Sequence, residues 1–234
     1  LVLAIVQGIT EWLPVSSSGH LVLFEAILDY EASLEFEIAL HFGTLMAVFV
    51  YFGKDIVDIL NDLFRLKWKS ENGRIGWLLV LASVPAGVVG FFFYDFFAGT
   101  FKSLALTAMG FAITGVFLLI ASLDLPKLRK NIKIGDSVIM GLVQMLAILP
   151  GISRSGATIA TGLIRGLKEK SAMRFSFLMA IPVIFGANLM AFGNTTLPTS
   201  TLWAALVSFA VGLLTIHVLF KYALRSRKNL RWFG

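Results

Sequence analysis

Three long windows of this sequence contain no charged residue, and they constrain the fold more than any other feature. The windows are Ile75–Tyr94, Ser103–Leu123 and Phe175–Phe220. About 20 apolar residues cross the hydrocarbon core of a bilayer as one helix, so the last window is long enough for two crossings. Only 15% of the residues are charged, whereas about 25% is usual in soluble domains. The pattern predicts an all-α polytopic membrane protein.

Lysine and arginine residues gather in four short clusters that predict the orientation of the chain. The clusters lie at 54–74, 127–133, 165–174 and 225–231. Short cytoplasmic loops carry an excess of these residues, so the clusters are expected on the cytoplasmic side. Connections without that excess are expected outside: Glu25–Glu37, Asp95–Lys102 and Gly193–Thr201. Membrane orientation therefore explains the net charge of +6, and no nucleic-acid partner is expected.

These signals predict five full crossings and one segment that does not cross. The crossings are Phe36–Phe52, Ile75–Tyr94, Ser103–Leu123, Phe175–Phe192 and Leu202–Tyr222. The remaining segment, Ser137–Ile164, lies between two cytoplasmic clusters and is interrupted at Pro150–Gly156. It must enter and leave on one side, so a re-entrant helical hairpin is expected over 137–164.

The first 28 residues show a similar interruption. Leu1–Leu13 has a helical pattern, Pro14–Gly19 interrupts it, and His20–Leu28 resumes toward the acidic connection. Both arms are too short to cross a bilayer. A second re-entrant hairpin, entered from the outside, is therefore expected over 1–28.

The two interrupted segments resemble each other in sequence. Val6–Gly19 and Val143–Gly156 share Val, Gln, Ser, Ser and Gly in register. Similar segments that enter from opposite faces are typical of an inverted repeat. We therefore expect one integral-membrane domain, 1–234, with two inverted-topology repeats and about nine helices. Repeat one would cover about 1–123 and repeat two about 136–234.

Both interruptions are expected to line one polar pocket, because irregular backbone at membrane depth needs protein or water to satisfy its polar groups. We call each interruption, with the residues that adjoin it, a tip. Arg154 lies in the second tip, before a helix expected to start near Ala157. Ser16, Ser17 and Ser18 precede a helix in the same manner. Helix N-termini and arginine bind phosphate oxygens. The tips therefore favour a phosphate or diphosphate ligand.

Glu11 and His20 supply the reactive groups of the first tip. Gln7 and Glu11 are four residues apart and share a helix face. Glu11 can act there as a base or metal ligand, with Gln7 as a neutral oxygen donor. Attack on phosphorus needs a serine or histidine nucleophile activated by a base, and a divalent metal would neutralise phosphoryl charge. Ser17 and His20 are both candidate nucleophiles.

Structural roles compete with these assignments. Serines at such positions also serve as N-caps or join helices, Arg154 could snorkel, and Glu11 could be a buried neutral carboxyl. Glu37 and His41 are four residues apart near the outer boundary, where interfacial placement is favoured over a metal pair. His217 is interpreted as structural. Four of the tryptophans are interpreted as interfacial or packing residues: Trp12, Trp77, Trp203 and Trp232.

The two tips resemble the signature motifs of the undecaprenyl-pyrophosphate phosphatases of the bacitracin-resistance type. The first motif is Gln7-x-x-x-Glu11 with Pro14-Val-Ser-Ser-Ser-Gly-His20. The second is Pro150-Gly-Ile-Ser-Arg-Ser-Gly-Ala-Thr158. The resemblance covers essentially the whole chain, including Phe175–Pro182 after the second motif.

The resemblance implies a hydrolase that removes the terminal phosphate of a C55 polyprenyl diphosphate and regenerates the monophosphate lipid carrier for cell-wall polymer synthesis. It implies a multi-pass protein of the plasma (inner) membrane, a site open to the outer face, and Mg²⁺ or Ca²⁺ as cofactor. The expected partners are the lipid substrate and the bilayer, and a homo-oligomer is compatible with them. A polyprenyl-phosphate flippase or anion transporter on the same repeat is the alternative.

The motif chemistry and the resemblance together assign the site residues. The catalytic residues are Glu11, Ser17, His20 and Arg154. The substrate-binding residues are Gln7, Ser16, Ser18, Gly19, Ser153, Ser155, Gly156 and Thr158. Glu11 and Gln7 are the candidate metal ligands. Gln7 stands where many members carry Glu, which weakens a two-carboxylate metal site, and the chain stops at 231–234 where members usually continue into a last helix.

Overall fold

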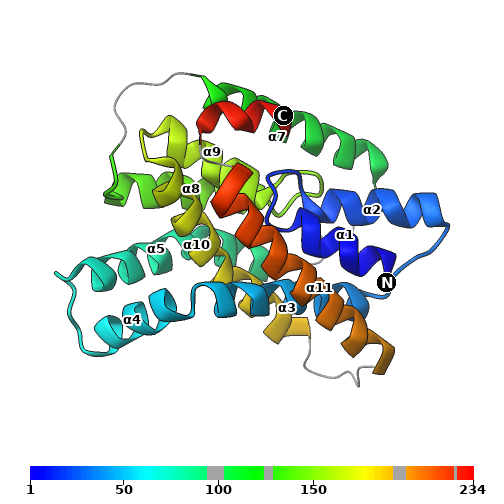
Figure 1. The fold of residues 1–234 in the computed structure, drawn as a ribbon, viewed down its shortest axis with the longest axis horizontal. Coiled ribbons are helices and arrows are strands. Elements are labelled where there is room, and N and C mark those ends of the chain that lie inside the picture. The colour runs from blue at the N-terminus through cyan, green and yellow to red at the C-terminus, as the bar shows by residue number, and fades with distance from the viewer. Residues whose placement is uncertain (94–102, 124–128, 192–198, 224–225) are drawn as a thin grey trace.

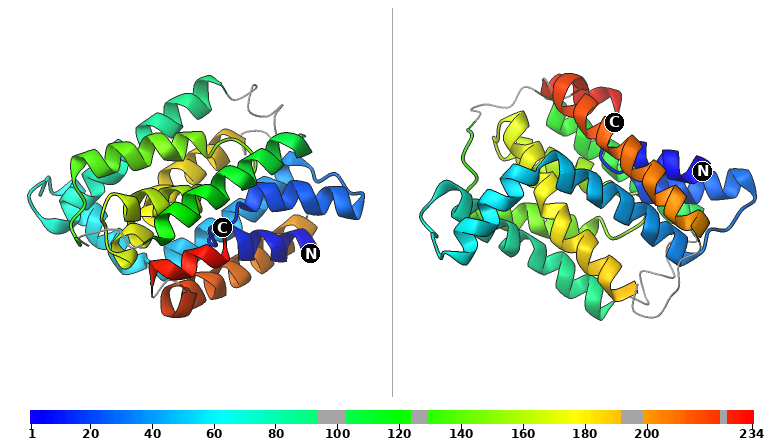
Figure 2. Two further views of the ribbon diagram at one scale, coloured as in Figure 1. Left: turned by 90° about the horizontal axis from the view of Figure 1, so that it is seen from above. Right: turned by 60° about the horizontal axis from the view of Figure 1, so that its bottom comes forward.

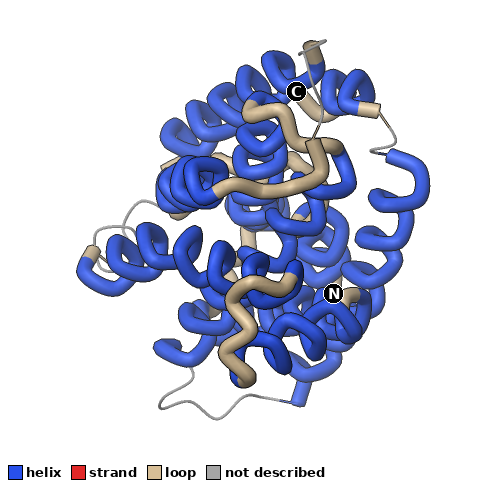
Figure 3. The backbone as a smooth tube through the Cα atoms, turned by 90° about the vertical axis from the view of Figure 1, so that its left-hand side faces the viewer, coloured by secondary structure: helices blue, strands red, loops and turns tan. Residues whose placement is uncertain are grey.

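A computed structural model describes residues 1–93, 103–123, 129–191, 199–223 and 226–234, and this part of the chain forms helices and loops without a strand (Figure 3). Figure 1 shows the arrangement of the helices. The α-helices are α1 (Val2–Thr10), α2 (Ser17–Leu28), α3 (Leu34–Tyr51), α4 (Gly53–Phe64), α5 (Glu71–Phe92), α7 (Leu104–Ser122), α8 (Ile134–Leu146), α9 (Arg154–Ile164), α10 (Glu169–Ala191) and α11 (Thr199–Val218). A π-helical turn, Leu219–Ala223, and a 3-10 helix, Arg227–Trp232, follow.

Within the described residues, five segments are long and apolar enough to cross a membrane. They are α3, α5, α7, most of α10, and Thr201–Lys221, which contains most of α11. These segments match the five predicted crossings and confirm an all-α, multi-pass membrane protein. The predicted connection Asp95–Lys102, most of Gly193–Thr201, and Lys127 of the second basic cluster lie outside the described residues.

The described residues form ten α-helices, a π-helical turn and a 3-10 helix, so the expected count of about nine was too low. The additional helix is α4, which occupies part of the basic segment 54–74 that was predicted as a connection. Ile59 of α4 is buried, and Ile59 and Leu63 pack against Gly76 of α5. Charged residues such as Asp58 interrupt the apolar ones at helical spacing, so α4 is amphipathic. Because α4 is not uniformly apolar, the apolar windows of the sequence do not reveal it.

The second helix of each interrupted segment begins one turn earlier than predicted. Helix α2 begins at Ser17 rather than His20, and α9 begins at Arg154 rather than near Ala157. The Oγ atom of the preceding serine accepts the backbone N–H of the glycine three residues later, at 3.3 Å in α2 and 3.0 Å in α9. A capping serine satisfies one of the unpaired N–H groups of a first turn, so the helix starts directly after it. The capping residues are Ser16 and Ser153.

The long helices pack around the two interrupted segments. Helix α11 lies along α3 and α1, α5 lies along α8, and α10 contacts α3, α5 and α9 (Figure 2). The larger apolar core includes Trp12, Phe175 and Phe177, and a smaller core includes Leu3 and Leu21. The loop between α1 and α2 therefore lies between two cores.

The buried carboxylate of Asp136 links the start of α8 to the end of α9 through hydrogen bonds. Asp136, at the start of α8, is fully buried and accepts hydrogen bonds from Arg129 (2.7 Å), Arg165 (3.1 Å) and the Lys133 N–H (2.7 Å). Burial by itself raises the pKa of Asp136, but these hydrogen bonds outweigh burial and hold the pKa below its ordinary value of 3.8. Asp136 thus joins α8, the end of α9 and the preceding connection.

Helix α7 supports the other end of this pair, the loop at 147–153. The hydroxyl of Thr114 donates to the Gly151 carbonyl at 3.2 Å and accepts the Ser153 N–H at 2.8 Å. Gly151 has a positive φ of 84°, which glycine adopts without strain. A Cβ atom at Gly110 would overlap the Pro150 carbonyl oxygen, so α7 can approach the loop only through a glycine there.

We expect Gly110→Ala to lower stability and Gly87→Ala to raise it. Both glycines lie inside helices, and alanine gains about 1 kcal/mol of helix propensity over glycine. A Cβ at Gly87 meets nothing within 4 Å, whereas a Cβ at Gly110 meets the loop backbone. Overpacking of this kind costs about 2 kcal/mol. Thermal unfolding in detergent measures both effects, and equal shifts in the two variants would contradict the close approach of α7.

Candidate functional site

Glu11 is the centre of the site. It follows α1 as its C-cap, and it is 8% exposed. One carboxylate oxygen, Oε1, accepts a hydrogen bond from Nη2 of Arg154 at 2.6 Å. The other oxygen, Oε2, accepts from Oγ of Ser17 at 2.6 Å and from Nε2 of Gln7 at 3.1 Å. Four of the predicted site residues therefore meet at one carboxylate.

The Arg154 side chain makes three contacts, with Glu11, Trp12 and Ser176. It opens α9, its side chain is 14% exposed, and Nη2 is paired with Glu11. Its guanidinium carbon lies 5.3 Å from the ring centroid of Trp12, within the range of a cation–π interaction. Nη1 donates to the Ser176 carbonyl at 3.4 Å. Guanidinium carries five N–H donors, so several N–H groups remain for a ligand.

Trp12 packs in the interior of the protein. Its side chain is fully buried, and its ring centroid lies 5.0 Å from that of Phe177. The same ring contacts the guanidinium of Arg154. Of the two roles expected for this residue, packing is the one that the structure shows, and the ring packs against Arg154.

The two tips touch directly. Oγ of Ser155 donates to the Leu13 carbonyl at 2.9 Å. A Cβ at Gly156 would come within 3.0 Å of the Pro14 carbonyl oxygen. In Figure 1 the loops that join α1 to α2 and α8 to α9 lie beside each other near the middle of the molecule. The carboxylate of one tip and the guanidinium of the other therefore form a single site.

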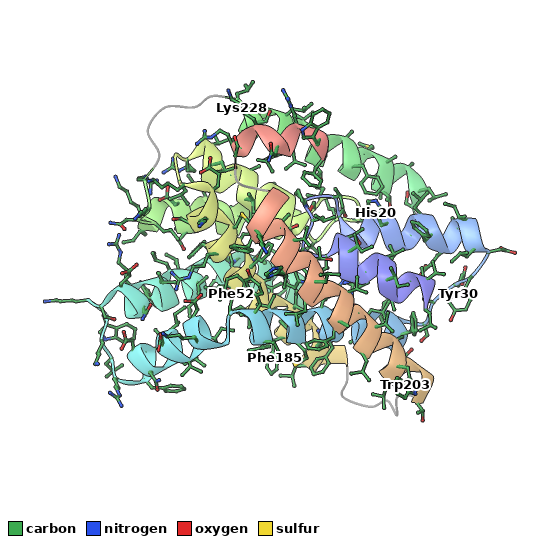
Figure 4. The ribbon with its side chains drawn as sticks, viewed as in Figure 1. His20, Tyr30, Phe52, Phe185, Trp203 and Lys228 are labelled. Carbon is green, nitrogen blue, oxygen red and sulfur yellow. The ribbon has the colours of Figure 1, made fainter. Side chains whose placement is uncertain are left out.

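His20 lies in the first turn of α2, on the side that faces α7 (Figure 4). Its Nδ1 atom is 2.8 Å from the Ser16 carbonyl, and its ring meets Phe111 edge-on at 5.2 Å. A carbonyl oxygen can only accept, so Nδ1 carries hydrogen and Nε2 is free to meet a ligand. Ser16 has a positive φ of 68°. Such strain, about 1–3 kcal/mol, is typical of functional sites.

The remaining serines form two matching pairs. Oγ of Ser16 lies 3.3 Å from Oγ of Ser18, and Oγ of Ser153 lies 3.2 Å from Oγ of Ser155. Gly19 and Gly156 donate their N–H groups to the capping serines of these pairs. These residues, predicted to bind substrate, thus shape the tips through hydrogen bonds inside the protein.

Thr158 also makes its hydrogen bonds within the protein. It is fully buried, its hydroxyl donates to the Arg154 carbonyl at 2.7 Å, and it lies 2.6 Å from the hydroxyl of Ser176. Ser176 is the residue whose carbonyl accepts from Arg154. Thr158 therefore fixes the start of α9 against α10 and, through it, the position of the guanidinium.

His41 lies beside Glu11, although its sequence position had favoured interfacial placement. Its Nε2 atom lies 3.8 Å from Oε2 of Glu11, and its side chain is 28% exposed. Glu37, His41 and Thr44 occur at i, i+4 and i+7 of α3, and this spacing places polar groups on one face of an apolar helix. That polar face was the available signal that α3 contacts the site.

The fold and this geometry define a class: a multi-pass helical membrane protein with a buried carboxylate that joins an arginine and a serine hydroxyl. Comparison with known families then names the group. A sequence model described as bacitracin resistance protein BacA matches residues 1–234. The chain belongs to this family.

Curated relatives agree over nearly their full lengths. A protein of Methanococcus vannielii named undecaprenyl-diphosphatase is 37% identical over 240 residues, which cover 100% of this chain and 93% of that protein. Proteins with the same name from Thermosipho africanus and Rubrobacter xylanophilus are 38% and 40% identical. They cover 98% and 100% of this chain, and 92% of their own lengths in both cases.

Proposed function

We propose that this protein is a membrane phosphatase that hydrolyses undecaprenyl diphosphate to the monophosphate lipid carrier. The name of its relatives, undecaprenyl-diphosphatase, supports the substrate and the reaction. The observation that carries the proposal is the short hydrogen bond from Ser17 to Glu11, whose other oxygen is paired with Arg154. A serine hydroxyl, a base and a phosphate-binding cation are the parts that a phosphoryl transfer requires.

In the first step Glu11 accepts the proton of Ser17 while Oγ attacks the terminal phosphorus. The phosphoanhydride bond breaks, and the lipid monophosphate leaves as an anion that needs no proton. The unpaired N–H groups of Arg154 and of the first turns of α2 and α9 stabilise the equatorial phosphoryl oxygens. Ser17 is the nucleophile in this proposal because it contacts the base, whereas Nδ1 of His20 is bound to the Ser16 carbonyl.

In the second step water attacks the phosphoserine, and the bond between phosphorus and Oγ of Ser17 breaks. Glu11 first releases the Ser17 proton to solvent. It then accepts one proton of the attacking water and passes it to Oγ of Ser17, so both the serine and the carboxylate are restored. The free Nε2 of His20 contacts the phosphoryl group in this arrangement and orients it.

The pairs α1–α2 and α8–α9 serve in this proposal as re-entrant hairpins of two inverted repeats, about 1–123 and 136–234. Their arms have 9, 12, 13 and 11 residues, fewer than the roughly 20 that a crossing needs. The matching serine caps support a common origin. The charge distribution favours the plasma (inner) membrane with a site that opens outward.

A divalent metal, Mg²⁺ or Ca²⁺, fits the site only together with substrate. Oε1 of Gln7 is buried without a hydrogen-bond partner, and it lies on the residue that contacts Glu11. In the described part of the chain no group of three or more acidic or histidine side chains could hold a metal ion. Mg²⁺ is commonly held by one or two protein oxygens and substrate phosphates. Gln7 and Glu11 would hold it, and it would neutralise phosphate charge.

A flippase or anion transporter on the same fold is less well supported. Binding alone would use Arg154 and the helix N-termini. It does not require a serine hydroxyl at 2.6 Å from a buried carboxylate.

Ser17→Ala and Glu11→Gln should each lower kcat by about 10³-fold, because they remove the nucleophile or its base. Inorganic phosphate release from undecaprenyl diphosphate by purified protein in detergent measures the effect. Ser122→Ala is the matched serine control, because the Ser122 hydroxyl donates to the Leu119 carbonyl near the end of α7, in the same helix. Wild-type turnover by Ser17→Ala would refute the covalent step.

Gln7→Glu should lower the Mg²⁺ concentration for half-maximal activity by about tenfold, because a second carboxylate raises the charge of the ligand set. A metal titration after treatment with chelator measures this concentration. An unchanged metal requirement in Gln7→Glu would argue that position 7 does not contact the metal.

A further inference from the structure

The connection between the membrane-spanning helices α3 and α5 carries an exposed apolar strip that the candidate site does not use. Helix α4 follows α3 directly and lies side by side with α5 (Figure 1). Five large apolar side chains of α4 and of the turn after it are between 45% and 83% exposed, and we call them the α4 strip: Val57, Leu60, Phe64, Leu66 and Trp68. Exposed apolar patches mark contacts with a membrane or with another protein.

The turn that ends α4 exposes one of these side chains on a strained backbone. The N–H of Leu66 donates to the Leu63 carbonyl at 3.0 Å, and the N–H of Lys67 donates to the Asp62 carbonyl at 2.9 Å. These two bonds form a Schellman turn, in which the residue at the position of Leu66 is left-handed and is usually glycine. Leu66 has a φ of 54°, and its side chain is 64% exposed. Backbone strain under a mostly exposed apolar side chain indicates a contact outside the chain.

Basic residues alternate with the apolar ones through this turn. Positions 64–69 read Phe-Arg-Leu-Lys-Trp-Lys, and the three basic side chains are exposed. The Lys67 Nζ atom lies 3.8 Å from Oδ1 of Asp62, which offsets part of its charge. Arg65 and Lys69 flank the apolar side chain of Leu66 in sequence. Clusters of lysine and arginine next to a membrane-spanning helix attract the anionic headgroups of phospholipids.

Two tryptophans place the turn at the end of a membrane span. Trp68 of the turn meets Trp77 of α5 edge-on, with ring centroids 6.4 Å apart, and both side chains are about half exposed. Trp77 belongs to the segment of α5 that is apolar enough to cross a membrane. Tryptophan is enriched where such helices pass through the headgroup layer. The turn after α4 therefore lies beside a span, where lipid headgroups are within reach.

We propose that the α4 strip and the turn after it form a binding surface for anionic phospholipids. The side chains of Phe64, Leu66 and Trp68 enter the adjoining leaflet, and Arg65 and Lys69 contact the headgroup phosphates. A zwitterionic lipid offers the same hydrocarbon but no net negative charge, so the surface prefers an anionic lipid. The flanking spans, α3 and α5, favour a membrane over a protein partner for this strip. The proposal does not depend on the phosphatase activity.

The test uses the absence of cysteine from this chain. Leu66→Cys can therefore carry one uncharged fluorescent label in the purified full chain. The labelled protein is placed in phosphatidylcholine vesicles that contain a minor share of brominated phosphatidylglycerol, or the same share of brominated phosphatidylcholine. Bromine quenches a fluorophore that it contacts. We expect brominated phosphatidylglycerol to quench the label at least about threefold more strongly, because basic residues near a bilayer attract anionic lipid.

Two double variants in the labelled protein separate this surface from the net charge of the chain. Arg65→Gln with Lys69→Gln should abolish the preference for phosphatidylglycerol. Lys168→Gln with Lys170→Gln removes the same charge from two exposed residues of another basic cluster, and it should keep the preference. Unchanged thermal unfolding in both double variants verifies that they are folded.

Three results would each overturn the proposal. Equal quenching by the two brominated lipids would show no preference for anionic headgroups. Quenching by neither lipid would place position 66 in water and leave the α4 strip to a protein partner. Loss of the preference in both double variants would show a general effect of net charge and no specific surface.

Discussion

The ion pair between Glu11 and Arg154 joins the two interrupted segments of the chain inside the protein. Moving two charges out of water is expensive, and attraction offsets that cost only with good geometry and further hydrogen bonds. Both conditions are met, because Glu11 accepts from Ser17 and Gln7, and Arg154 rests on Trp12 and donates to Ser176. The pair holds together two loops that are 143 residues apart in sequence.

The hydroxyl groups of the two tips divide into two kinds. Most are buried and bond to each other or to backbone carbonyls, and these hydrogen bonds make the tips rigid. The Ser17 hydroxyl is different, because it donates to a carboxylate and is partly exposed. Rigid support around the Ser17 hydroxyl is what the proposed covalent step requires. The many serines of the motifs therefore do not imply many ligands to phosphate.

The local residue pattern predicted the spans and the interruptions, because each depends on the residues of a short stretch of chain. Apolar windows specify crossings, and Pro14 and Pro150 with nearby glycines specify breaks. The meeting of Glu11 with Arg154 could also be anticipated, since two buried opposite charges need each other. The position of His41 beside Glu11 depends on how α3 packs. Tertiary contacts determine that position, and local patterns do not reveal it.

The central claim is that Glu11 and Arg154 compensate each other inside the protein. A double-mutant cycle on thermal unfolding in detergent tests it most directly, with Glu11→Gln, Arg154→Gln and the double variant. Each single change leaves a buried charge without its partner, whereas the double change leaves none. We predict that the double variant is more stable than the sum of the single effects by about 2 kcal/mol. Additivity within about 0.5 kcal/mol would contradict the pair.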